Sequence, residues 1–123
     1  MTFAEVLNQQ WDGYEERHRN KANLLIHIVT VPLVWFAALQ IFGGLILMLV
    51  GVGGLKMWIY AAILITIALV AQHQGNAMEQ ARRPAPTNPK DFAIHAAAEQ
   101  FVTFPRFVLT GAWLRNLQGT PPS

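Results

Sequence analysis

Four histidines and several carboxylates stand near the ends of the apolar segments of this chain. Imidazole and carboxylate groups are common protein ligands of non-haem iron and zinc, and two histidines with one carboxylate can hold iron(II) while leaving positions open. These groups are therefore suitable ligands for a non-haem iron or a zinc site. The residues expected to bind the metal are His18, His27, His73, His95 and Glu99. The residues expected to act in catalysis are His18, His27 and Glu79.

Helical spacing relates several of these groups to one another. His27 lies inside the first strongly apolar segment, where polar groups are functional candidates by default. Asn23 precedes His27 by four residues, so the two share one face of a helix. His95 and Glu99 have the same spacing, which would present an imidazole and a carboxylate together. The residues expected to bind substrate are Asn23, Asn76, Arg82 and Arg83.

Each of these residues also has an ordinary structural interpretation. His18 and His95 could serve only as hydrogen-bonding groups near helix ends. Glu79 could form a local ion pair with Arg82 or Arg83 at helical spacing. Common catalytic motifs are missing from the sequence, including G-x-S-x-G, H-E-x-x-H and the phosphate-binding glycine loop. Composition and spacing alone therefore indicate a polar cluster at a membrane surface.

The composition favours a membrane protein. Hydrophobic residues make up 53% of the 123 residues and charged residues only 13%, against about 25% charged residues in soluble domains. Because the chain has no cysteine, a metal can only be bound by histidine, carboxylate or amide groups. The net charge is +2, and no basic cluster with interleaved aromatic residues is present, so we do not expect nucleic-acid binding. The first residues lack the pattern of a cleaved signal peptide.

The hydrophobic pattern predicts an all-α integral membrane protein, a helical hairpin that occupies residues 1–123 as a single membrane domain. The apolar run that begins at Leu24 is too long for one straight span, and we expect it to break at Gly43 and Gly44. Whether residues 43–54 make a further crossing is left open. The expected elements are an amphipathic helix over 2–18, a first span over 22–42, a second span over 55–83 and an interfacial C-terminal helix over 91–117.

The distribution of positive charge predicts the orientation of the hairpin. Lys56, at the start of the second expected span, is the one basic residue near the connection, and the other basic residues lie before the first span or at and beyond the end of the second. Cytoplasmic segments are enriched in lysine and arginine, so we expect both termini in the cytoplasm. The membrane would be a bacterial inner membrane or one like the endoplasmic reticulum. The expected partners are the lipid bilayer and a fatty-acid or other lipid substrate, and a homo-oligomer is possible.

Two motifs resemble those of one membrane family. The run H-R-N-K-A-N-L-L-I-H-I-V-T-V-P, which begins at His18, is similar to the family signature H-x4-N-x3-H-x4-P. The run A-Q-H-Q-G-N-A-M-E-Q-A-R-R-P-A is similar to Q-x2-G-H-x2-E followed by Pro-Ala. The family contains the fungal 2-hydroxy fatty acid dioxygenase, and the resemblance covers roughly residues 14–86. It implies a membrane enzyme that uses iron(II) and dioxygen to shorten a 2-hydroxy fatty acid by one carbon, with His18 and His27 at the iron.

The chain departs from this family pattern at Asn76, where the pattern has histidine. His73 lies one helical turn earlier and could substitute, and His95 with Glu99 could complete the site. Our leading hypothesis is an iron(II)-dependent dioxygenase in which Arg82, Arg83 or Arg106 orients the substrate carboxylate. The alternative is a non-catalytic membrane protein that binds lipid or a partner helix on the same fold. A third option is a zinc site with hydrolytic chemistry.

Overall fold

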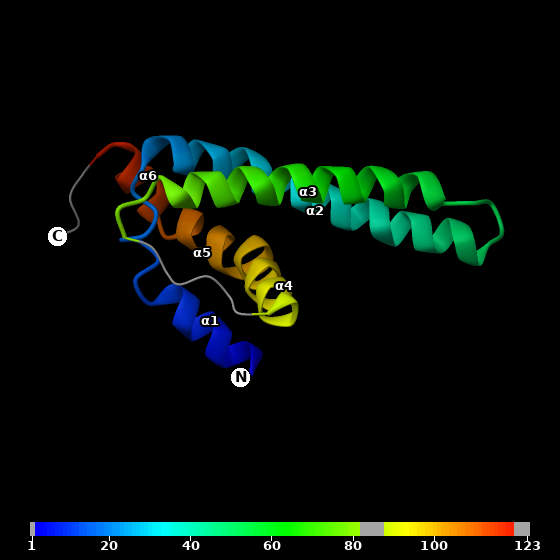
Figure 1. Cartoon of the computed structure of the whole chain (residues 1–123), viewed down its shortest axis with the longest axis horizontal. Coiled ribbons are helices and arrows are strands. Elements are labelled where there is room, and N and C mark those ends of the chain that lie inside the picture. The colour runs from blue at the N-terminus through cyan, green and yellow to red at the C-terminus, as the bar shows by residue number, and fades with distance from the viewer. Residues whose placement is uncertain (1, 82–87, 120–123) are drawn as a thin grey trace.

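Every element that the structure describes is a helix, which confirms the expected all-α class. The structure is a computed structural model, and it describes residues 2–81 and 88–119. Figure 1 shows two long helices side by side, with the shorter helices gathered at one end of the pair. The elements in chain order are α1 (Phe3–Trp11), α2 (Lys21–Leu49), α3 (Leu55–Ala77), α4 (Pro89–Ala98), the π-helix η1 (Glu99–Thr103), α5 (Phe104–Leu109) and α6 (Ala112–Leu117).

Helices α2 and α3 form the hairpin, and the break expected at Gly43 and Gly44 is wrong. Helix α2 continues through both glycines to Leu49, and the chain turns over residues 50–54. A Cβ atom on Gly44 would lie 2.7 Å from the Trp58 ring and 3.0 Å from the carbonyl oxygen of Gly54. Glycine is therefore used here for close helix packing, as in small-residue membrane interfaces, and not for a turn.

Three other expected boundaries differ from the observed ones. The first helix stops at Trp11 and not near residue 18, because Asp12 is already extended, with a ψ of 117°, and Gly13 follows with a left-handed φ of 74°. Helix α3 ends at Ala77, before the end expected at residue 83. The C-terminal segment begins at Pro89, and Gly111 with a φ of 83° separates α5 from α6.

The hairpin carries much exposed apolar surface. Both of its helices are long and apolar enough to cross a membrane. Large apolar side chains point outward along them, with Leu39 and Phe42 each 70% exposed and Leu49 77% exposed. Contiguous apolar surface of this kind marks a contact with lipid or protein. Insertion into a bilayer and the orientation of the hairpin stay predictions.

The packed core lies at the end of the hairpin where α2 begins and α3 ends. There η1 and α6 pack against α2, and α1 packs against α4 and η1 on the side away from the hairpin (Figure 1). The side chains of Tyr14, Leu24, Phe104 and Phe107 are almost fully buried and in one cluster. Indole and amide groups also tie the segments together, since Trp113 Nε1 donates to the carbonyl oxygen of Leu24 at 3.1 Å.

Pro105 explains the π-helix. Proline has no N–H, and its ring would clash with the carbonyl group four residues back in an α-helix. The chain widens instead, and the N–H of Phe104 donates to the carbonyl oxygen of Glu99, five residues back. The carbonyl oxygen of Gln100, five residues before Pro105, accepts a hydrogen bond from Trp35 Nε1 at 2.7 Å. The helix thus passes Pro105 unbroken, and π turns of this type are frequent at functional sites.

Candidate metal site

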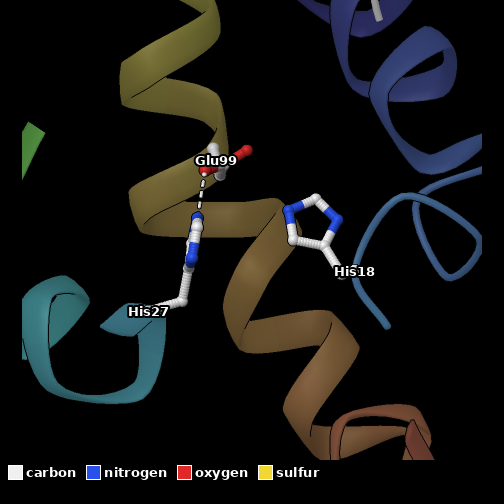
Figure 2. A group of neighbouring side chains, drawn as sticks. All are labelled: His18, His27 and Glu99. Carbon is white, nitrogen blue, oxygen red and sulfur yellow. Dashed lines mark hydrogen bonds and ion pairs between the residues drawn. The ribbon is translucent and has the colours of Figure 1, made fainter. Parts of the chain in front are cut away.

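His18, His27 and Glu99 form one cluster of metal-ligating groups. His18 lies in the loop between α1 and α2, His27 in the second turn of α2, and Glu99 at the start of η1. One ligand atom from each residue lies within 4.8 Å of the other two. Figure 2 shows the three side chains directed toward a common region from three separate segments. The cluster could hold a metal ion.

Both imidazole rings are fixed by backbone carbonyl groups. His18 Nδ1 lies 2.9 Å from the carbonyl oxygen of Tyr14, and His27 Nδ1 lies 3.0 Å from that of Asn23. Because a carbonyl oxygen only accepts, each Nδ1 must donate, and in the neutral ring the lone pair then lies on Nε2. A carbonyl partner on the second nitrogen is the usual arrangement of metal-binding histidine.

The surroundings of the two Nε2 atoms show whether a cation would fit between the three side chains. His27 Nε2 lies 3.2 Å from Glu99 Oε1, so a lone pair faces a carboxylate oxygen unless a proton or a cation lies between them. His18 Nε2 is buried and has no hydrogen-bond partner within the described ranges. A buried acceptor without a partner costs about 1–3 kcal/mol. A metal ion would satisfy both atoms, so the donor set fits one.

The surroundings keep His18 neutral. Burial lowers the pKa of His18 from 6.5 to about 4, and the nearby His27 adds to the lowering while Glu99 opposes it. The Tyr14 ring stacks on the His18 ring with their centroids 3.8 Å apart. The neutral imidazole is the form that binds metals. His18 is therefore ready to bind a metal at neutral pH.

Glu79 holds the start of α2 in place. Its Oε1 accepts hydrogen bonds from the backbone N–H groups of Arg19 and Asn20 at 2.9 and 3.0 Å, and its Oε2 accepts one from Asn23 Nδ2 at 2.6 Å. A carboxylate at the N-terminus of a helix is also favoured by the helix dipole. Glu79 is buried but lies outside the three-residue cluster. The catalytic role expected for it stays a prediction.

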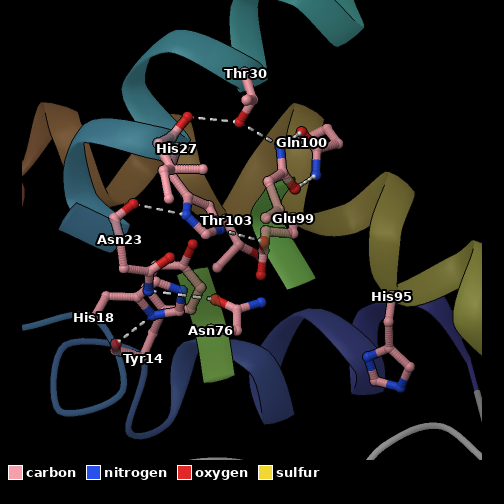
Figure 3. Close-up of polar contacts among 12 residues, drawn as sticks. Tyr14, His18, Asn23, His27, Thr30, Asn76, His95, Glu99, Gln100 and Thr103 are labelled. Atoms are coloured by element: carbon pink, nitrogen blue, oxygen red, sulfur yellow. Dashed lines mark hydrogen bonds and ion pairs between the residues drawn. The ribbon is translucent and has the colours of Figure 1, made fainter. Parts of the chain in front are cut away.

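A buried amide network connects η1 to the hairpin near the cluster. Gln72 Nε2 donates to Gln100 Oε1 at 3.0 Å, and Gln100 Nε2 donates back to Gln72 Oε1 at 2.6 Å. Gln72 Nε2 also donates to Thr30 Oγ1 at 2.9 Å. Figure 3 shows Thr30 and Gln100 close to His27 and Glu99. Because Gln100 follows Glu99 directly, the network fixes the part of η1 that presents the carboxylate.

The segment that carries both histidines matches a known protein family. Residues 4–93 match the model of a family described as 2-hydroxy-palmitic acid dioxygenase Mpo1-like. The chain belongs to the Mpo1-like family. The resemblance inferred from the two motifs is thus confirmed. The matched segment contains His18 and His27, whereas Glu99 lies beyond its end. Searches of curated proteins and of solved structures returned no match.

The other histidines expected as ligands lie outside the cluster of His18, His27 and Glu99. His73 is exposed on α3. His95 is half-buried on α4, and Figure 3 shows its ring well apart from His18 and His27. His95 is thus not a member of the cluster that contains Glu99. Their roles as ligands stay predictions, and the three groups that the structure brings together are His18, His27 and Glu99.

The residues expected to bind substrate occupy different positions. Asn23 is fully buried, and its Nδ2 also lies 3.4 Å from Asn76 Oδ1 on α3. Asn23 thus contributes to the contact between α2 and α3. Arg82 and Arg83 lie outside the described residues. Binding of substrate by these four residues stays a prediction.

Sequence reasoning missed two groups that hold the segments of the metal cluster in place. One is the Gln72 and Gln100 amide pair, although Gln72 belongs to the second family motif. The other is Asn116 of α6, whose Nδ2 donates to the carbonyl oxygens of Glu15 and His18 at 3.0 and 2.8 Å. Asn116 is 98 residues from His18, and no local pattern indicates their contact.

Proposed function

We propose that this protein is an iron(II)-dependent dioxygenase of 2-hydroxy fatty acids that shortens its substrate by one carbon. The observation that carries the proposal is the convergence of His18, His27 and Glu99 in a chain of the Mpo1-like family. Two histidines and one carboxylate with open positions are typical of non-haem iron(II) oxygenases. The same convergence favours an enzyme over the non-catalytic alternative, because a lipid-binding protein has no need of a buried ligand set.

In this proposal the chain holds and orients the ligands. Iron(II) would supply the binding and activation of dioxygen and a point of attachment for the substrate carboxylate and 2-hydroxyl. The carbonyl groups of Tyr14 and Asn23 keep the Nε2 atoms of His18 and His27 free for coordination. Burial of the cluster excludes water, which strengthens its electrostatic interactions. Glu99, whose side chain is 16% exposed, lies on the accessible side of the cluster.

Substrate orientation is a further part of the proposal. Asn23, Asn76, Arg82 and Arg83 would bind the polar end of the fatty acid. An arginine would hold its carboxylate through two parallel hydrogen bonds. The apolar hairpin would accommodate the alkyl chain within the bilayer, which accounts for a site at the level where α2 begins.

Metal content and turnover test this function together. Purified protein loaded anaerobically with iron(II) would be supplied with 2-hydroxypalmitate and dioxygen, and oxygen consumption and the one-carbon-shorter acid would be measured. We expect the wild type to contain iron. The variants His18→Ala, His27→Ala and Glu99→Gln should lose the iron, and their activity should fall by at least about 100-fold. His73→Ala tests an expected ligand that is exposed on α3 and lies outside the cluster, and retained iron and activity in this variant would remove His73 from the site.

Absence of bound metal in the wild type, together with no turnover in the presence of iron(II), would rule out the proposed reaction. Equal iron content in the wild type and His27→Ala would remove His27 from the site. Elemental analysis that finds zinc without iron would favour hydrolytic chemistry at the same ligands.

We also propose that α2 and α3 cross the membrane, with both termini in the cytoplasm. At 1.5 Å per residue, helices of 29 and 23 residues are about 43 and 35 Å long, and each exceeds a hydrocarbon core of about 30 Å. Because the chain has no cysteine, single cysteines can report the topology. A membrane-impermeant maleimide should label Val52→Cys from outside intact cells and Asn8→Cys only after permeabilisation. The reverse pattern would contradict the orientation.

A further inference from the structure

A groove lies between α1 and the C-terminal segment. Helix α1 lies beside α4 and η1 (Figure 1). The groove between them has a volume of about 170 Å³. Its lining includes Leu7, Asn8 and Trp11 of α1 and Val102, Thr103 and Arg106 of the C-terminal segment. No member of the metal cluster lines it, so the groove is a separate site.

Arg106 gives the groove its charge. The guanidinium carbon of Arg106 lies 4.0 Å from the centroid of the Trp11 ring. Within residues 2–81 and 88–119, Arg106 forms no side-chain hydrogen bond and no ion pair. Arg17 and Arg115 differ, since Arg17 donates to two backbone carbonyl oxygens and Arg115 pairs with Glu15.

Trp11 therefore orients the Arg106 guanidinium while leaving the N–H groups at its edge for another partner. A planar guanidinium matches a carboxylate group, which it can bind through two parallel hydrogen bonds. Among the described residues no acidic side chain lines the groove, so none of them competes within it for Arg106 or repels an anion. An anionic group is thus the complementary ligand.

The remaining walls determine what is attached to that anion. Leu7 and Val102 are apolar, and the Thr103 hydroxyl already donates its proton to Gln10 Oε1. The volume exceeds that of one water, about 30 Å³, and is below the 300–1,000 Å³ or so of sites that enclose a whole drug-sized ligand. It suits a head group and the first methylene groups of a chain whose remainder lies outside.

We propose that this groove binds a fatty carboxylate, with the carboxylate on Arg106 and the first methylene groups against Leu7 and Val102. Asn8, which also lines the groove, offers an amide donor for the second carboxylate oxygen. The site would hold a free fatty acid outside the metal cluster. It goes beyond the proposed function and does not depend on a metal.

The test measures the full-length, metal-free protein in a neutral detergent, titrated with octanoate or with octanol. The readout is the NMR signal of the Arg106 Nε–H group, assigned by its loss in Arg106→Gln, with binding affinity from calorimetry. We expect a saturable shift with octanoate and none with octanol. Arg106→Gln should weaken octanoate binding by about tenfold or more, as expected for loss of a charged hydrogen bond. Arg115→Gln, a neighbouring arginine outside the groove, should bind octanoate as the wild type does.

Three results would overturn the proposal: a shift that does not saturate, an equal response to octanol, or equal octanoate affinity in Arg106→Gln. Displacement of octanoate by a short-chain phosphatidylglycerol of higher affinity would also overturn it, because the occupant would then be a phospholipid. His27→Ala should bind octanoate normally. Loss of metal binding and loss of groove binding are therefore distinguishable.

Discussion

Gly75 of α3 lies directly against the side-chain amide of Asn23 on α2. A Cβ atom on Gly75 would overlap with Asn23 Oδ1. Asn23 is fully buried, its Nδ2 donates to Glu79, and its carbonyl oxygen accepts from His27 Nδ1. The approach of α3 to this residue therefore determines the position of the helical turn that carries His27.

Replacement of Gly75 by alanine should separate the two helices at the metal site. Overpacking of a buried contact costs about 1–3 kcal/mol, and iron content should fall because His27 moves. Gly43→Ala is the matched control, since a Cβ there meets only the end of the flexible Met57 side chain at 3.0 Å. Unfolding in mild detergent and iron content would be measured for both variants. Equal stability and iron content in the two would contradict the role of the Gly75 contact.

The sequence predicted the helical hairpin well because long apolar runs leave few other structures. It misplaced the break, because a glycine pair serves equally for a turn or for close packing. The position of Trp58 against Gly44 decides between these uses, and it is a tertiary contact. The end of the first helix at Trp11 likewise depends on the conformations of Asp12 and Gly13, which the amphipathic pattern does not reveal.

The site was predictable in part. The motif that begins at His18 indicated His18 and His27, and the order of its residues fits the loop and helix that carry them. Glu99 was one of several candidate carboxylates and histidines. Its selection depends on the packing of η1 against the hairpin, through Gln100, which helical spacing does not determine. The contacts of Glu79 with the start of α2 could likewise not be predicted, because they depend on how the end of α3 packs beside the start of α2.

The two glutamates near the site should respond differently to conversion to glutamine. Glu99→Gln removes a charged ligand at the edge of the cluster, so iron content should fall while the stability of the metal-free protein changes by less than about 1 kcal/mol. Glu79→Gln replaces one buried acceptor oxygen by an amide N–H₂ group, which would face the N–H donors of the start of α2. We expect it to destabilise the metal-free protein by about 1.5–3 kcal/mol.

Chemical unfolding of the metal-free variants and iron analysis would separate the two roles. The outcome that contradicts the assignment is a Glu79→Gln protein that is as stable as the wild type without metal and yet binds no iron. Glu79 would then be a ligand, in agreement with the catalytic role expected from the sequence.

Asn116 should affect metal binding without touching the metal. Its amide donates to the carbonyl oxygens of Glu15 and His18, and these bonds hold the loop that presents the His18 ring. Asn116→Ala should lower iron affinity by about 10–100-fold, as is typical for residues that orient ligands. Competition with a chelator would measure the affinity. Arg115→Ala, next in the chain and half exposed at its side chain, should leave it unchanged. Equal losses in both variants would indicate general destabilisation of α6.

The stability of the metal-free protein should fall at acidic pH because of His18. The pKa of His18 is about 4 in the folded protein and 6.5 for an exposed histidine. The unfolded chain therefore binds a proton that the folded protein does not bind between these values. Stability is fully present above about pH 6.5 and is lost as the pH falls toward 4. At about 1.4 kcal/mol per pKa unit, the loss is about 3 kcal/mol.

His18→Gln should remove this part of the pH dependence, because glutamine does not titrate. Unfolding free energies of the metal-free protein, measured at intervals from pH 7 to pH 4, would show the difference. His73→Gln replaces an exposed histidine and should retain the full dependence of the wild type. Parallel curves for the wild type and His18→Gln would mean that the buried His18 ring is not the group that makes the folded protein sensitive to acid.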